Sequence, residues 1–178
     1  MKVKYSDLKN KRVFITGGGS GIGGSIVEHF CEQGSEVYFV DIDLKETKKL
    51  LNKIKKNKFR TPTFIECNLL DINKLEKTIK NIIAKKGPIH ALINNAANDD
   101  RHTTDQVDEK YWENRMAINL KHYFFAAKAV VKSMKKMKAG SIVNLSSVSW
   151  MLGEGDKVVY ETAKSAVVGL TKIGRAHV

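Results

Sequence analysis

Residues 12–23 read RVFITGGGSGIG, and this stretch decides the fold. Its first five residues form a short, mostly apolar run with β-branched side chains, which is typical of a buried parallel strand. Glycine fills five of the next seven positions, and a helical pattern with its apolar residues on one side follows at once. A strand, a glycine-rich turn and a helix in this order form the setting of a dinucleotide-binding turn.

The glycine-rich turn predicts a pyrophosphate site. Glycines let the backbone approach the phosphates closely, and the helix N-terminus adds N–H donors and the positive end of its dipole. A glycine-rich stretch alone also fits a merely flexible turn. The contacts that we expect with a dinucleotide cofactor come from Gly17, Gly19, Ser20, Gly21, Ile22 and Gly23.

The residues after this turn indicate which dinucleotide binds. Glu36 to Val40 predict a second strand, which ends at Asp41. A carboxylate about 20 residues beyond the glycines binds the adenosine ribose of NAD and repels the 2′-phosphate of NADP. Ile42 follows Asp41 where an Arg or Lys would favour NADP, so we predict NAD. Asp41 could instead cap the next helix, although Asp43 is better placed for that role.

A second group of residues predicts proton-transfer chemistry. Lys164 follows Tyr160 by four residues, so both side chains share one face of a helix and the ammonium favours the phenolate. A phenol, with its usual pKa of about 10, would then act as a base near neutral pH. Ser147 precedes Tyr160 by thirteen residues, and its hydroxyl would hold a substrate oxygen. The alternative is a surface Tyr and Lys on an ordinary helix.

Five motifs in order resemble the short-chain dehydrogenase/reductase family, between about Leu8 and Lys172. They are Thr16 to Gly23, Asn94-Asn95-Ala96-Ala97, Asn119, Ser147 and Tyr160-Glu-Thr-Ala-Lys164. The resemblance implies that Tyr160 is the acid/base, Lys164 lowers its pKa and holds the ribose, Ser147 orients the substrate oxygen, and Asn119 supports a proton relay. It also implies cofactor contacts from Asn68, Leu69, Asn95, Ala96, Tyr160 and Lys164.

The sequence departs from the family pattern at two positions. Asn68 stands where the family usually has Asp, but an amide can still donate to an adenine nitrogen. Ala97 replaces a frequent Gly. The stretches 98–102 and 147–153 are also similar to bacterial NAD-dependent xylose and other aldose 1-dehydrogenases. That likeness implies oxidation of a sugar at C1 to the lactone, and a 3-oxoacyl or other secondary alcohol or ketone substrate is the alternative.

The alternation of short apolar runs with helical patterns predicts an α/β fold. We expect a Rossmann-like, doubly wound parallel sheet with helices on both faces. The predicted strands span 12–16, 36–40, 62–66, 89–93 and 140–146, and the predicted helices span 21–33, 44–57, 71–86, 107–137 and 158–172.

The end of the chain differs from the family pattern. Members of the family continue past the catalytic helix with further strands, so we expect residues 1–172 to form one nucleotide-binding domain that lacks its C-terminal strands. Residues 173–178 read as a tail foreign to that domain. A non-catalytic nucleotide-binding fragment is therefore a second hypothesis.

The net charge of +12 raises a third hypothesis, nucleic-acid binding. Lysines outnumber arginines 26 to 5 and are spread over helix faces, and no nucleic-acid motif is present, so we expect no specific nucleic-acid partner. No signal peptide or apolar run of membrane-spanning length appears, so we expect no membrane partner and a cytoplasmic location. The resemblance implies a homo-oligomer, either a dimer or a tetramer.

Several other reactive side chains have structural interpretations. Cys31 and Cys67 fit no paired motif and are predicted to be structural thiols. His102 lies in an acidic loop, where a substrate contact is one interpretation, and His122 lies in a long helix, where packing or exposure is expected. No recognised metal-ligand spacing occurs, so no metal is expected. The aromatic residues of the same long helix are read as core or subunit interface: Tyr111, Trp112, Tyr123 and Phe124.

Overall fold

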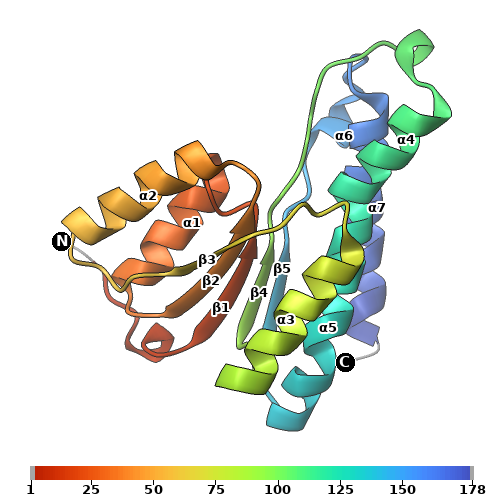
Figure 1. Ribbon diagram of the computed structural model, residues 1–178. Helices are drawn as coiled ribbons and strands as arrows, with labels where there is room; N and C mark the ends of the chain where they lie inside the picture. Colours follow the sequence, from red (N-terminus) through yellow and green to blue (C-terminus); the bar gives the residue numbers. More distant parts are fainter. Residues whose placement is uncertain (1–2, 177–178) are drawn as a thin grey trace.

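The computed structural model describes residues 3–176, and side chains from residue 3 to residue 174. Five parallel strands form one sheet in the order β3-β2-β1-β4-β5 (Figure 1). The strands are β1 (Arg12–Thr16), β2 (Glu36–Asp41), β3 (Thr63–Glu66), β4 (Ala91–Asn94) and β5 (Ser141–Asn144). This is the Rossmann-like arrangement that the sequence predicts, and each strand lies within a few residues of its expected position.

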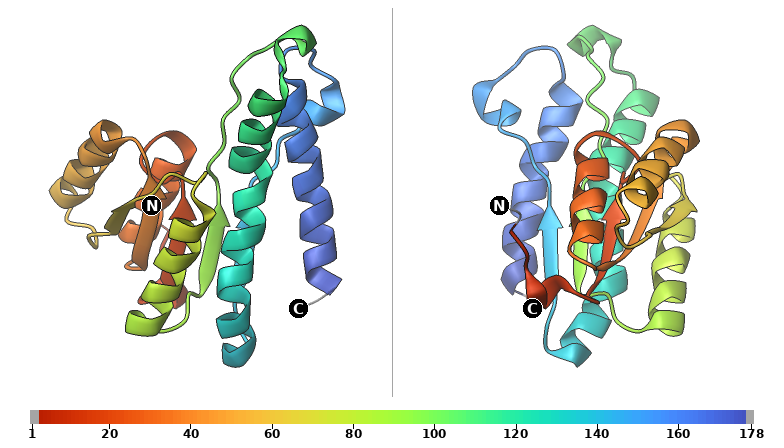
Figure 2. Two further views of the ribbon diagram at one scale, coloured as in Figure 1. Left: turned by 45° about the vertical axis from the view of Figure 1, so that its right-hand side comes forward. Right: turned by 90° about the vertical axis from the view of Figure 1, so that its left-hand side faces the viewer.

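Helices cover both faces of the sheet (Figure 2). One face carries α1 (Gly21–Glu32) and α2 (Leu44–Lys56), and the other carries α3 (Ile72–Lys86) and α5 (His122–Met137). The helix α7 (Val158–Ala176) packs beside α4 (Glu109–Met116) and the turn that follows α4. The remaining helical segments are short: η1 (Ser6–Leu8), η2 (Thr104–Gln106), η3 (Ala117–Lys121) and α6 (Ser149–Leu152).

The apolar run of β1 explains why both faces are covered. Val13 and Ile15 pack against Val27 of α1 and Ile54 of α2, whereas Phe14 packs on the side of α3 and α5. Successive side chains of a strand point to opposite faces, so a fully apolar strand needs a helical layer on each side. All three β1 side chains are fully buried.

The structure differs from the predicted elements at η3 and at the short segments η1, η2 and α6. The predicted helix at 107–137 is interrupted by η3, a π-helical turn between α4 and α5. The short helix α6 was not predicted, because a four-residue helix carries no measurable periodicity. Within residues 3–176, no helix combines the length and the apolar character that crossing a membrane requires.

The strand order places a crevice between β1 and β4. After β1, the chain adds β2 and then β3 on one side of it. The chain then returns and places β4 on the other side of β1. The helices that connect β1 to β3 and the helix that leads back to β4 therefore lie on opposite faces, and folds of this kind bind ligands in a crevice at the carboxyl ends of the two strands where the order reverses. Thr16 pairs with Asn94 at the last position of the two strands, so Gly17 and Asn95 face one another across the crevice.

Candidate active site

The glycine-rich turn folds tightly against its own chain. A Cβ atom at Gly23 would lie 1.8 Å from the Gly17 carbonyl oxygen, and one at Gly17 would lie 2.8 Å from the Cα of Ala96. Neither position accepts a larger residue without displacement of the backbone. The turn is thus a fixed structure with glycines where contacts demand them, which disfavours the interpretation as a flexible linker.

The N-terminus of α1 fits an anion. Ser20 occupies the N-cap position, but its side chain makes no capping hydrogen bond. Gly21 has a φ of +53° and open space where its side chain would be. N–H groups in the first turn of a helix have no partner within the helix, and they favour negative charge. These residues therefore fit the pyrophosphate of a dinucleotide. Ile22 is 69% exposed at the same end.

Asp41 organises the glycine-rich turn. Its Oδ2 accepts from the Gly19 N–H at 2.7 Å, and its Oδ1 accepts from the N–H groups of Ile42 and Asp43 at 2.7 and 2.9 Å. A carboxylate offers about four acceptor positions, so capacity remains for a ribose hydroxyl. Asp43, not Asp41, caps α2 by accepting from Glu46, as its position suggests.

Hydrogen bonds tie the two sides of the crevice together. The Thr16 hydroxyl accepts from the N–H groups of Asn95 and Ala96, at 3.0 and 3.2 Å. The Asn95 side chain in turn donates to the carbonyls of Thr16 and Gly17. With both of its acceptor positions in use, the Thr16 hydroxyl donates to Nε2 of His122 at 3.3 Å. His122 is fully buried, as the packing interpretation expects, and burial lowers its pKa to about 3.

Asn119 lies in the π-helical turn η3 and is fully buried. Its side chain forms a double hydrogen bond with the backbone of Asn98: Oδ1 accepts from the Asn98 N–H at 2.8 Å, and Nδ2 donates to the Asn98 carbonyl at 2.9 Å. π-Helical turns recur at functional sites because they break the regular backbone bonding of a helix. Asn119 therefore holds the loop after β4 over the crevice.

Tyr160 and Lys164 share one face of α7, as predicted. The Lys164 side chain is buried, and its ammonium lies 5.6 Å from the centre of the Tyr160 ring. The ammonium donates to the Tyr123 hydroxyl at 2.9 Å and to the Leu145 carbonyl at 2.7 Å. Burial lowers the pKa of Lys164 to about 8, because an ammonium loses its hydration there.

Tyr123 is a member of this site that the sequence did not reveal. It was read as core or interface, and its ring is indeed fully buried. Its hydroxyl also accepts from Lys164 and donates to the Leu145 carbonyl at 3.1 Å. Only the packing of α5 against α7 brings together these two residues, which are 41 positions apart. No local sequence signal points to this pair.

The two candidate serines contact each other. The hydroxyls of Ser147 and Ser149 lie 2.9 Å apart, and Ser147 also accepts from the Ser149 N–H at 3.2 Å. Ser149 is buried, whereas Ser147 is only partly buried. The greater exposure of Ser147 agrees with its selection as the residue that meets a substrate.

Two of the residues expected to contact the cofactor, Asn68 and Leu69, lie after β3 and differ in burial. Asn68 uses its side-chain oxygen to accept from the Leu70 N–H at 3.0 Å, so its amide nitrogen is the side-chain donor that a ligand could use. The Leu69 side chain is buried in the core with Leu75 and Ile79. Leu69 is therefore restricted to backbone contacts with a ligand.

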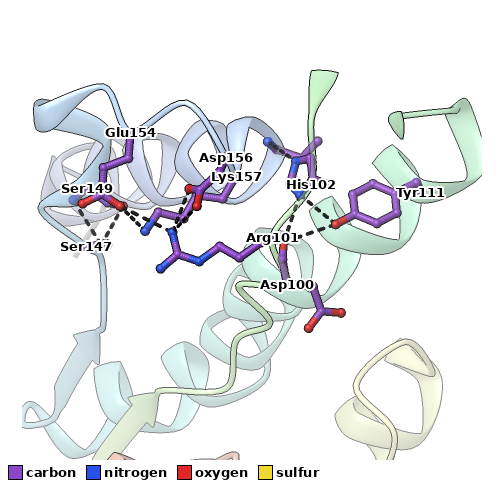
Figure 3. Close-up of polar contacts among 10 residues, drawn as sticks. Asp100, Arg101, His102, Tyr111, Ser147, Ser149, Glu154, Asp156 and Lys157 are labelled. Carbon is purple, nitrogen blue, oxygen red and sulfur yellow. Dashed lines mark hydrogen bonds and ion pairs between the residues drawn. The ribbon is translucent and has the colours of Figure 1, made fainter. Parts of the chain in front are cut away.

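A polar cluster joins the loop after β4 to the segment that precedes α7 (Figure 3). Arg101 donates to both carboxylate oxygens of Asp156, at 2.7 and 2.8 Å, and His102 is buried between the two segments. Among the described residues, no group of three or more His, Cys, Asp or Glu side chains has the arrangement of a metal site. Cys31 and Cys67 are both buried and unpaired, as structural thiols would be.

Comparisons with known proteins agree with this geometry. A probable galactose dehydrogenase of Rhizobium meliloti is 38% identical over 169 residues, and a D-xylose 1-dehydrogenase of Caulobacter vibrioides is 41% identical over 168 residues. These alignments cover 95% and 94% of this chain. The chain itself spans only 66% of the length of either relative.

Solved structures and a family model point the same way. The ligand-free aldohexose dehydrogenase of Thermoplasma acidophilum superposes with a TM-score of 0.81 at 32% identity, over 94% of this chain and 61% of that one. The model of the short chain dehydrogenases matches residues 11–177. The match takes in the glycine-rich turn, the crevice between β1 and β4, and the Tyr160–Lys164 pair, so the chain belongs to the short-chain dehydrogenase family.

Proposed function

We propose that the protein carrying this chain is an NAD-dependent sugar dehydrogenase that oxidises an aldose at C1 to the lactone. The observation that carries the proposal is the buried ammonium of Lys164, held next to the Tyr160 ring on α7. The names of the similar proteins, which are galactose, xylose and aldohexose dehydrogenases, support the substrate class.

The proton step falls to Tyr160. The Lys164 ammonium lies 5.6 Å from the centre of the Tyr160 ring, and an ionised phenol at this position would accept the proton of the C1 hydroxyl. Lys164 is held in place by Tyr123 and by the Leu145 carbonyl, so its charge is positioned before substrate binds. Ser147 would donate a hydrogen bond to the same sugar oxygen while Ser149 fixes its orientation.

The nucleotide would lie along the crevice, with its pyrophosphate at the N-terminus of α1 and its adenosine ribose at Asp41. NAD, when bound, supplies the acceptor for the hydride that leaves C1. As the C1–H bond breaks and the hydroxyl proton passes to Tyr160, a C1=O bond forms, which gives the lactone. The negative charge of Asp41, with the exposed Ile42 next to it, favours NAD over NADP.

The test is a rate measurement on the protein that carries this chain. Initial rates of NADH or NADPH formation are recorded with xylose, galactose and glucose, each with NAD and with NADP, and the sugar product is identified as a lactone by mass spectrometry. Oxidation of at least one aldose, faster with NAD, is expected. Reduction of a 3-oxoacyl ester without any aldose oxidation would refute the sugar assignment and leave the family unaffected.

Two further expectations remain predictions. We propose that the protein is a homo-oligomer, because an apolar groove runs between α5 and α7 and Phe124 on its wall is 50% exposed. The other residues along this groove are Leu120, Lys121, Phe125, Ala166 and Leu170. Sedimentation of the purified protein would determine its state. We also propose a cytoplasmic location, which fractionation of the source cells would test.

A further inference from the structure

His102 lies at the centre of the contacts between the loop after β4 and the start of α7 (Figure 3). It is 5% exposed, and both its backbone and its ring are engaged. Its N–H donates to the Asp156 carbonyl at 2.7 Å, and its Nε2 accepts from the Val159 N–H at 3.4 Å. His102 therefore holds the chain on both sides of Lys157, immediately before Tyr160.

The bond to Val159 has the chemistry of a helix cap. Val159 is the second residue of α7, and its N–H is one of those that find no partner inside the helix. Ser, Thr, Asp or Asn at the preceding position usually supplies an acceptor. Lys157 stands there instead, and an ammonium has no acceptor to offer. The acceptor comes from His102, 57 residues earlier in the chain.

The surrounding groups fix the ring in one tautomer. Because Nε2 accepts a hydrogen bond from the Val159 N–H, it presents a lone pair and the ring proton lies on Nδ1. Nδ1 is 2.9 Å from the Asp100 carbonyl oxygen and 2.8 Å from the Tyr111 hydroxyl, so it donates toward both. The Tyr111 ring also packs against the His102 ring, with centres 4.8 Å apart. With both nitrogens engaged, His102 has no atom left for a substrate.

The neighbouring ion pairs are less suited than His102 to fixing the start of α7. Arg101 and Asp156 form a close pair, but their side chains are 58% and 53% exposed. Exposed pairs of this kind contribute little, because water and salt screen the attraction. Arg115, paired with Asp100, stabilises the Tyr111 side of the ring instead. The buried histidine is thus the group that determines where α7 begins.

We propose that His102 is a positioning residue for Tyr160: it caps α7 from outside that helix and so fixes the turn that carries the phenol. Val159 and Tyr160 are adjacent, and a first turn that frays would let the phenol move relative to Ser147 and Lys164. The inference deepens the proposed function, since it assumes that Tyr160 performs the chemistry. The cap itself is a structural statement that can be tested without any turnover.

Two variants of His102 test the roles of its two ring nitrogens separately. In His102→Gln, the side-chain oxygen occupies the place of Nε2 and can accept from Val159. In His102→Asn, the shorter amide replaces Nδ1 and can donate to the Asp100 carbonyl, but nothing reaches Val159. The two amides thus differ chiefly in the presence of the cap. Arg101→Ala, which removes the exposed ion pairs with Asp156 and Glu154, serves as a comparison.

The first measurement is hydrogen exchange of the Val159 and Tyr160 amides in the purified chain, with α1 amides as an internal reference. We expect about fivefold faster exchange in His102→Asn, as for the loss of a typical cap, a rate near that of the wild type in His102→Gln, and a smaller effect of Arg101→Ala. Equal exchange in the Asn variant and the wild type would overturn the proposal. So would fast exchange in a folded Gln variant, which decides the matter even when the Asn variant does not fold.

The second measurement is the split between kcat and KM for aldose oxidation by the protein that carries this chain. Positioning of Tyr160 predicts that kcat falls in His102→Asn and is restored in His102→Gln, while KM for NAD stays constant. A change in KM alone would exclude the link to Tyr160. If no aldose is oxidised by the wild type, the proposed function fails, whereas the exchange data still decide whether His102 caps α7.

Discussion

Replacement of Lys164 by Met should remove a rise in stability with pH that the buried ammonium produces in the wild type. Lys164 is 2% exposed, and its pKa falls from 10.5 to about 8 in the folded protein. At about 1.4 kcal/mol for each pKa unit, this difference corresponds to about 3 kcal/mol. The charged form that the proposed chemistry requires is therefore held in the folded protein at the expense of stability.

The direction in which stability changes with pH follows from the number of protons bound by the folded and the unfolded chain. Between pH 8 and 10.5, the unfolded chain still holds the lysine proton that the folded chain has released, so the stability contributed by this group rises with pH. Of the roughly 3 kcal/mol lost at pH 7, about 2 kcal/mol is recovered by pH 9.5. Burial raises the pKa of the Tyr123 phenol, so near pH 10 only the unfolded chain ionises at this residue, and this opposite effect on stability stays small up to pH 9.5.

The assay is urea unfolding of the wild type and Lys164→Met, followed by tryptophan fluorescence at several pH values from 7 to 9.5. The free energy of unfolding of the wild type, minus that of the variant, should rise by about 2 kcal/mol across the series. Subtraction removes the titrating groups that both proteins share and that do not contact Lys164. The Tyr123 hydroxyl stays satisfied in the variant through the Leu145 carbonyl, so no buried group is left without a partner there.

Lys172→Met provides the matched control. Lys172 is exposed on the same helix, so folding changes the hydration of its ammonium little, and its difference from the wild type should not vary with pH. A flat profile for Lys164→Met as well would refute the reasoning, since it would mean that the Lys164 ammonium keeps its hydration in the folded protein.

Three other predictions concern the proposed site. Tyr160→Phe keeps the ring and should leave the unfolding midpoint unchanged, while kcat for aldose oxidation falls by about 10²–10⁴; near-normal turnover would exclude Tyr160 as the base. Asp41→Ala should weaken discrimination against NADP, measured as the ratio of the two dissociation constants, whereas Asp43→Ala should lower stability through the lost α2 cap and leave that ratio unchanged. Ser147→Ala should lower kcat more than Ser149→Ala, and the reverse order would assign the substrate contact to Ser149.

The sequence by itself determined the fold and most of the proposed chemistry. The apolar run of β1, the glycines after it and the four-residue spacing of Tyr160 and Lys164 are local patterns. Their meaning follows from the periods of strands and helices. For this reason the strands, the long helices and the glycine-rich turn could be predicted without knowledge of contacts between distant residues.

Other parts of the site were decided only by tertiary structure. The partner of Lys164 is Tyr123, 41 positions earlier, and the cap of α7 is His102, 57 positions before Val159. The π-helical turn at Asn119 likewise places its amide on the backbone of Asn98. No local pattern distinguishes these residues from ordinary core tyrosines, histidines and asparagines. Their roles arise when the packing of α5, α7 and the loop after β4 excludes water, because buried donors and acceptors must then find partners within the protein.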